Sequence, residues 1–136
     1  PYKTRASRAN PFRRSQDTMT APRDYKVYLA DILDAIASIE RYVTSMTPEQ
    51  FTADTKTQDA VIRNLEVIGE AAKRIPESVQ SVYPGLAWHP AAAMRDFLIH
   101  EYPEVDAEAV WNTVVHDLPP FKKGIIEILE KSESHS

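Results

Sequence analysis

A guanidinium, a carboxylate, an imidazole and a phenol, those of Arg95, Asp96, His100 and Tyr102, fall within eight positions of the sequence. If this segment is helical, Asp96 and His100 share one face, and so do Arg95 and Tyr102. The carboxylate of Asp96 can then hold the imidazole of His100 and favour its protonated form. Arg95 and His100 stand about 140° apart around an ideal helix, so only the long arginine side chain can bring both groups to one substrate.

An arginine, a histidine and a nearby acid suit the cleavage of RNA without a metal or a cofactor. The 2′-hydroxyl attacks the adjacent phosphorus, and a histidine with a pKa near neutrality can remove or supply a proton. An arginine can hold the phosphate oxygens and stabilise the charge of the transition state. One histidine per chain leaves one proton transfer without a partner, which favours a twofold dimer in which two copies of His100 converge.

The same residues also have a purely structural interpretation, and spacing alone favours it. His100 near a helix C-terminus is often only a cap, Asp96 can be its ion-pair partner, and Tyr102 can simply pack. The other histidines form no convincing metal site, and the sequence holds no H-E-x-x-H, P-loop or G-x-G-x-x-G pattern. We therefore expect neither a metal nor a cofactor.

Helical spacing of apolar residues dominates the rest of the chain, with no competing β-type alternation. A helix is predicted over about 25–45, with Asp24 as its candidate N-cap, from one apolar stripe: Tyr25, Leu29, Ile32, Ile36, Ile39 and Val43. The residues Thr47-Pro48-Glu49-Gln50 have the pattern of a second helix start, with Thr47 as cap and Gln50 three residues on.

A longer helix is predicted over about 57–75, with an apolar face of Val61, Leu65, Ile68, Ala72 and Ile75. Its outer face carries Arg63, Glu66, Glu70 and Arg74, and the pairs Arg63/Glu66 and Glu70/Arg74 stand at contact spacing. Gly69 costs the helix about 1 kcal/mol against alanine and allows another backbone to approach beside Glu70.

The C-terminal half is predicted to hold a short element from Pro76, a helix over 91–102 and a last helical segment capped by Asp106. Pro119-Pro120 predicts a break or kink in that segment, and residues from Glu130 onward read as a frayed polar tail. Together these elements predict an all-α protein, an antiparallel bundle of four to five helices, four of them main helices.

The length of 136 residues suits one domain, which we place at residues 19–131, followed by a polar tail at 132–136. Residues 1–18 are expected to be a disordered basic extension, or an added segment preceding a natural start at Met19. The chain has no cysteine, no apolar run of about 20 residues and no signal-peptide-like region. These features suit a cytoplasmic protein without a membrane span.

The charge is unevenly distributed. Residues 1–18 hold five basic residues and one acidic residue, so residues 19–136 hold 11 basic and 19 acidic residues and a net charge of −8. Bulk attraction to nucleic acid is not expected of such a body, so RNA must be met at a local cluster.

The segment Arg95-x4-His100-x-Tyr102 resembles the signature of the HEPN-domain ribonuclease toxins of the HepT type. The sequence from Arg63 to Ala71, RNLEVIGEA, resembles the first motif of that family. Further matches are Trp88, Val110-Trp111 and Asp117-Leu118-Pro119, so the resemblance covers about residues 24–130.

The resemblance implies an all-helical, HEPN-like toxin that cuts RNA without a metal, usually as a homodimer, with Arg95 and His100 catalytic. Asp96 stands where the family commonly has asparagine, so its role shifts toward orienting His100, and Glu70 is a weaker candidate for the same cleft. The implied partner resembles a nucleotidyltransferase antitoxin of the MntA type, in a type VII-like toxin–antitoxin system. Such a partner adds AMP to the motif tyrosine, here Tyr102, which would block phosphate binding. The alternative is a non-catalytic HEPN module that binds a nucleotide or a partner, and the acidic body favours it.

Overall fold

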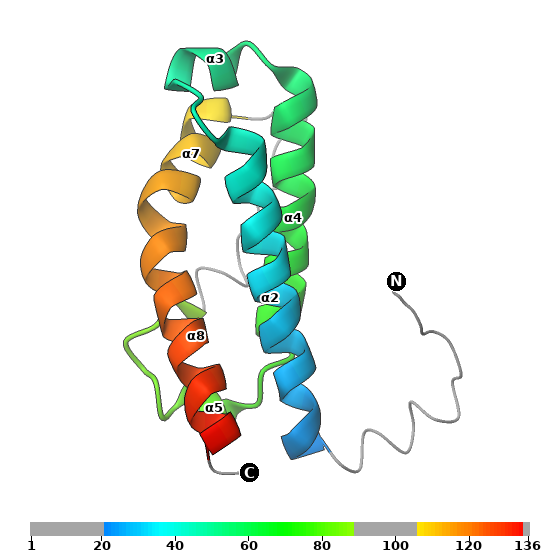
Figure 1. Cartoon of the computed structure of the whole chain (residues 1–136), viewed down its shortest axis with the longest axis vertical. Helices are drawn as coiled ribbons and strands as arrows, with labels where there is room; N and C mark the ends of the chain where they lie inside the picture. Colours follow the sequence, from blue (N-terminus) through cyan, green and yellow to red (C-terminus); the bar gives the residue numbers. More distant parts are fainter. Residues whose placement is uncertain (1–20, 89–105, 135–136) are drawn as a thin grey trace, which may run out of the picture.

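The computed structural model of this chain describes residues 21–88 and 106–134. Within these ranges every regular element is helical and no strand is present, which confirms the all-α prediction. The helices carry the labels of Figure 1, in which the long helices run along the long axis of the molecule. The expected segment 1–18 and the helix expected at 91–102 lie outside the described residues.

Helices α2 (Ala21–Val43) and α4 (Thr55–Lys73) lie side by side and antiparallel (Figure 1). Each presents its predicted apolar stripe to the other. Leu29, Ile32, Ile36 and Ile39 of α2 are buried, as are Val61, Leu65, Ile68 and Ala72 of α4. The prediction of Asp24 as N-cap is wrong, because α2 begins three residues earlier and Asp24 falls in its first turn.

The short helix α3 (Pro48–Thr52) closes one end of the bundle (Figure 1). Thr47 caps it as predicted: its hydroxyl accepts from the backbone N–H of Gln50, and the Gln50 side chain accepts from the N–H of Thr47. Phe51 carries α3 into the core, where its ring is fully buried. Buried Gln58 of α4 donates from Nε2 to the carbonyls of Phe51 and Thr52, which satisfies two carbonyls at the end of α3.

Helices α7 (Ala107–Asn112) and α8 (Leu118–Ser134) are joined by a π-helical stretch, η1 (Thr113–Asp117). The irregularity predicted from Pro119-Pro120 takes the form of this stretch and does not end the helix. Prolines have no N–H, so regular α-helical bonding cannot continue across them, and a π-turn just before them absorbs the mismatch. Helix α8 also continues past Glu130, where the sequence predicted a frayed tail.

The core joins all three long stretches. Val110, Val114, Leu118, Phe121, Ile125 and Ile128 form the buried stripe of α7, η1 and α8. The connection after α4 contains α5 (Glu77–Gln80), which begins directly after Pro76 as predicted. No helix in the described ranges has the length and apolarity needed to cross a membrane.

Candidate active site

Arg95, Asp96, His100 and Tyr102 all lie outside the described residues, so their proposed roles stay predictions. The structure does describe the chain on both sides of them, and it places the fifth candidate, Glu70. The described chain ends at Trp88 before these residues and resumes at Asp106 after them. How firmly these flanks are held bears on any site built between them.

Trp88 anchors the preceding flank to α8. Its side chain is buried, its ring packs edge-to-face on Phe121 with centroids 5.7 Å apart, and its Nε1–H donates to the carbonyl oxygen of Tyr83 at 3.0 Å. Two residues earlier, Leu86 lies so close to α8 that a Cβ on Gly124 would meet its side chain. The turn before residue 89 is therefore fixed by packing on one face of α8.

Asp106 fixes the following flank. Its carboxylate accepts a hydrogen bond from the backbone N–H of Ala109 at 3.1 Å and so caps α7, as the sequence predicted. One turn later the ring of Trp111 packs on Phe51 of α3, with centroids 5.2 Å apart and an angle of 43°. Thus α7 begins at a capped position that is held against α3.

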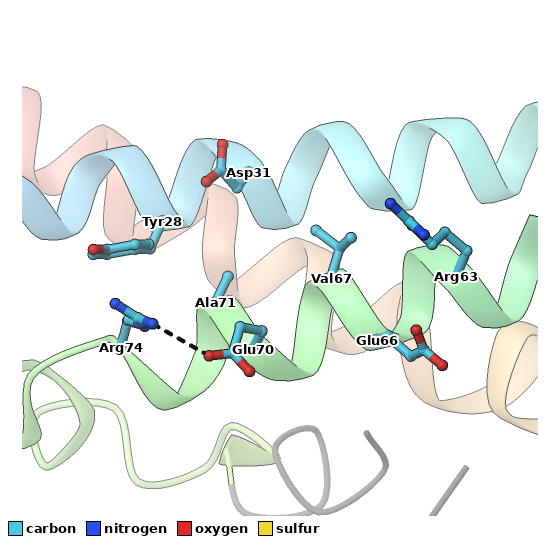
Figure 2. Close-up of a pocket in the computed structure, with 8 residues that line it drawn as sticks. All are labelled: Tyr28, Asp31, Arg63, Glu66, Val67, Glu70, Ala71 and Arg74. Atoms are coloured by element: carbon cyan, nitrogen blue, oxygen red, sulfur yellow. Dashed lines mark hydrogen bonds and ion pairs between the residues drawn. The ribbon is translucent and has the colours of Figure 1, made fainter. Parts of the chain in front are cut away.

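Glu70 lies in a groove between α2 and α4 with a volume of about 520 Å³ (Figure 2). Residues of both charges line it: Tyr28 and Asp31 from α2, and Arg63, Glu66, Val67, Glu70, Ala71 and Arg74 from α4. The sequence predicted the charged face of α4. It missed Tyr28 and Asp31, whose only signal was their spacing of three on the margin of the apolar stripe of α2.

Arg74 connects the two helices at one end of the groove. Its guanidinium lies 6.0 Å from the ring centroid of Tyr28, and its Nη2 lies 3.4 Å from a carboxylate oxygen of Glu70. The Tyr28 hydroxyl, followed by the Glu70 carboxylate, raises the pKa of Arg74 above its ordinary value. Arg74 is therefore a cation, and its contact with Glu70 lies at this end of the groove.

The predicted ion pair Glu70/Arg74 is thus confirmed, whereas no ion pair forms between Arg63 and Glu66. Figure 2 shows the Arg63 side chain directed toward α2, away from the Glu66 carboxylate. Within the described ranges, no cluster of three or more His, Asp or Glu side chains could hold a metal ion. The groove offers positive and negative groups side by side, which suits polar recognition more than metal chemistry.

Comparison with known proteins identifies the family of the chain. The family model described as "Ribonuclease HepT-like" matches residues 32–128. That range includes α3, α4, α5, α7 and η1, the second half of α2, and the larger part of α8.

This chain covers nearly the whole length of several curated relatives. A Thermococcus cleftensis protein named "Probable ribonuclease HepT" is 47% identical over 109 residues, which are 80% of this chain and 98% of that protein. A Methanocaldococcus jannaschii protein named "Putative RNase MJ0127" is 41% identical, over 82% of this chain and 92% of that protein. A Caldanaerobacter subterraneus protein named "Putative RNase TTE0752" is 35% identical, over 85% of this chain and all of its own length. No solved structure matches significantly.

Proposed function

Because this chain belongs to the HepT-like ribonuclease family, we propose that it is an endoribonuclease that cuts RNA without a metal ion. The observation that carries the proposal is the family match over residues 32–128, which contains the whole Arg95-x4-His100-x-Tyr102 pattern. The relatives named as ribonucleases support it, since this chain aligns with 92% or more of the two most similar ones described above.

The chemistry assigns a role to each candidate. His100 moves a proton to or from the reacting oxygens, and Arg95 holds the scissile phosphate and stabilises its transition-state charge. Asp96 orients the imidazole and favours its charged form. Glu70 plays a supporting part from α4, where its ion pair with Arg74 limits its freedom.

Attack by the 2′-hydroxyl needs one proton removed from that hydroxyl and one delivered to the leaving 5′-oxygen. One histidine in each chain's motif can serve one of these transfers. A homodimer that brings two copies of His100 to one scissile phosphate supplies both.

The test is cleavage of a fluorescently labelled RNA by the purified protein in excess EDTA. His100→Ala should lower the rate by about 10²- to 10⁴-fold while circular dichroism and the melting temperature stay unchanged. The matched control is His116→Ala, since His116 is an exposed histidine on η1. Cleavage that survives His100→Ala, or that EDTA abolishes, would refute the proposal. Tight binding of a partner without any RNA turnover would instead favour a non-catalytic module.

We further propose that the protein is the toxin of a toxin–antitoxin pair, neutralised by a nucleotidyltransferase that adds AMP to Tyr102. The phenolic oxygen attacks the α-phosphorus of ATP and pyrophosphate leaves. The added phosphate places negative charge and bulk near Arg95, where the RNA phosphate must bind. Co-expression with the partner should add AMP to the intact mass, and Tyr102→Phe should prevent it. Modification mapped to another residue would contradict this assignment.

A further inference from the structure

Helices α3 and α7 meet at one end of the bundle (Figure 1), and a pocket with a volume of about 890 Å³ lies beside them. We call it the α3–α7 pocket. Its walls come from α3, the start of α4, and α7 with its cap. A pocket of this volume is in the range of small-molecule sites. None of its described lining residues belongs to the site proposed for RNA cleavage.

Three carboxylates line the α3–α7 pocket, and its described lining residues include no basic side chain. Glu49 belongs to α3, Asp106 is the cap of α7, and Glu108 lies in the first turn of α7. Within residues 21–88 and 106–134 none of the three forms an ion pair. The pocket therefore carries negative charge that the described chain does not neutralise.

Helix capping explains part of this acidity. The Asp106 carboxylate accepts from the backbone N–H of Ala109, and Glu49 and Glu108 lie in first turns, where the helix dipole favours an acid. A helix N-terminus carries roughly half a positive charge, and α3 and α7 have only five and six residues. Three full negative charges therefore outweigh the helix ends around the pocket.

A buried amide carbonyl lines the same pocket. Gln58 of α4 is only 8% exposed, and its Nε2 donates to the carbonyls of Phe51 and Thr52. Its Oε1 accepts no hydrogen bond from any residue that the structure describes. Because a buried acceptor without a donor is destabilising, this oxygen indicates a bound molecule that donates to it. The carboxylates beside it favour a cationic donor over water.

Trp111 adds an aromatic surface to the α3–α7 pocket. Its ring packs on Phe51 and is still only half-buried, and the face of an indole attracts ammonium groups. A metal ion suits the pocket less well, because no three His, Asp or Glu side chains of the described residues are grouped closely enough to hold one. The lining therefore matches an organic cation.

We propose that the α3–α7 pocket binds a polyamine, a linear organic cation with two or more ammonium groups. Carboxylates on two helices, Glu49 on α3 and Glu108 on α7, match ammonium groups at separate points along one ligand. The methylene chain between these groups packs on Trp111, and one N–H donates to Oε1 of Gln58. A nucleotide or an RNA strand is disfavoured, because its phosphates would meet the carboxylates.

Calorimetric titration of the full chain with spermidine is the first experiment. One spermidine per chain should bind saturably, and Glu49→Gln or Glu108→Gln should weaken binding roughly three- to tenfold, the effect of losing one partly exposed ion pair. Butylamine, with a single ammonium group, should bind more weakly than spermidine. Glu130→Gln is the matched control, since it removes one carboxylate at an exposed position on α8, outside the pocket.

Two outcomes of the titration would overturn the proposal. Equal weakening by Glu130→Gln would show diffuse attraction to an acidic surface. Displacement of spermidine by an equal concentration of Mg²⁺ would show that the pocket holds only counterions. The titration contains no RNA, so this site and the proposed ribonuclease activity can fail separately.

NMR locates the ligand through the two tryptophans of the chain. Spermidine should shift the indole N–H signal of Trp111 and leave that of Trp88 unchanged, since Trp88 packs on Phe121 and is not part of the pocket lining. Trp111→Phe assigns the signals and keeps an aromatic ring beside Phe51. Equal shifts of both signals, or an unmoved Trp111 signal at saturation, would refute the site. A lysine-rich peptide that shifts Trp111 where spermidine does not would also refute it, in favour of a polypeptide partner.

Discussion

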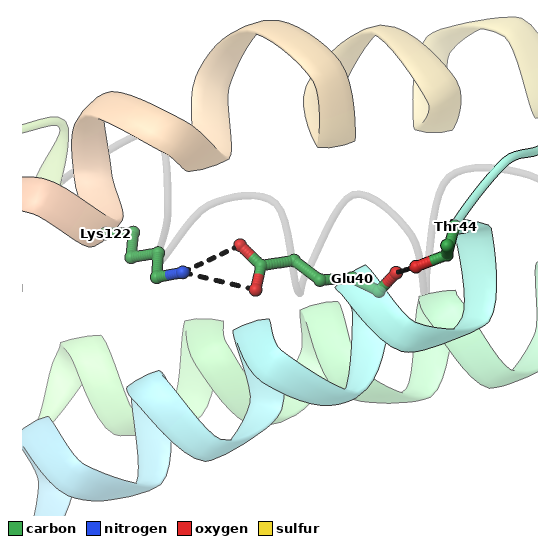
Figure 3. Close-up of polar contacts among 3 residues, drawn as sticks. All are labelled: Glu40, Thr44 and Lys122. Carbon is green, nitrogen blue, oxygen red and sulfur yellow. Dashed lines mark hydrogen bonds and ion pairs between the residues drawn. The ribbon is translucent and has the colours of Figure 1, made fainter.

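The Nζ of Lys122 on α8 donates two hydrogen bonds to the carboxylate of Glu40 on α2, at 3.0 and 3.2 Å (Figure 3). The partners are 82 residues apart in sequence, and both side chains remain partly exposed. At the same helix end, the hydroxyl of Thr44 donates to the backbone carbonyl oxygen of Glu40 at 2.6 Å. The ion pair thus fastens the last turns of α2 to the start of α8.

A double-mutant cycle with Glu40→Gln and Lys122→Met should give a coupling free energy of about 0.2–1 kcal/mol, the range for exposed ion pairs. The coupling should largely disappear in about 1 M salt, where charges this exposed are screened. Chemical denaturation measures both values. Lys123→Met replaces Lys122→Met in the control cycle and should be additive with Glu40→Gln. Coupling that persists in high salt would contradict an electrostatic origin.

The contact between Leu86 and Gly124 predicts that the effect of Gly124→Ala on stability changes sign when Leu86 is replaced. A Cβ on Gly124 would lie within 3 Å of three Leu86 side-chain atoms, so Gly124→Ala should cost about 1–3 kcal/mol through overpacking. The gain in helix propensity of about 1 kcal/mol offsets part of this cost and leaves a net destabilisation of up to about 2 kcal/mol. In a Leu86→Ala background the clash is gone, and Gly124→Ala should become stabilising. Thermal unfolding of the four variants checks the reversal, and the same sign in both backgrounds would contradict it.

Ser45 holds a backbone conformation that suits glycine better. It follows the end of α2 with φ at 63°, the left-handed region that commonly ends helices. Ser45→Gly should stabilise the protein by up to about 1 kcal/mol, because the side chain no longer strains the backbone. Ser81→Gly is the matched control: Ser81 ends α5 with φ −70°, so it should destabilise. Equal effects of the two changes on the midpoint of urea unfolding would refute the argument.

Asp54 should make the start of α4 sensitive to acid. Its carboxylate accepts from the backbone N–H of Thr57 at 3.0 Å and from the Thr57 hydroxyl at 2.7 Å. These bonds, the backbone bond first, lower the pKa of Asp54 below its ordinary value of 3.8. The stabilisation is therefore complete above that value and is lost as the pH falls through the lowered folded pKa. Carbon-detected NMR titration should show the Asp54 pKa rising in Thr57→Ala, and an unchanged pKa would contradict the assignment.

Features that depend on local chemistry were predictable from the order of residues along the chain. Helical spacing identified the buried stripes of α2 and α4, because residues three and four apart share one helix face. The caps at Thr47 and Asp106 were predictable because each side chain bonds a backbone N–H three residues away. Family membership was also legible in the sequence, where the Arg95-x4-His100 pattern stands in order with the α4 motif.

Contacts between residues far apart in the sequence depend on how the helices pack. Periodicity cannot show that Phe51 packs on Trp111, that Trp88 packs on Phe121, or that Gly124 accepts the close approach of Leu86. The same holds for the groove beside Glu70, where Tyr28 reaches Arg74 only because α2 and α4 lie antiparallel. These contacts join residues far apart in sequence, so their geometry follows from how whole helices pack and not from the spacing along any one of them.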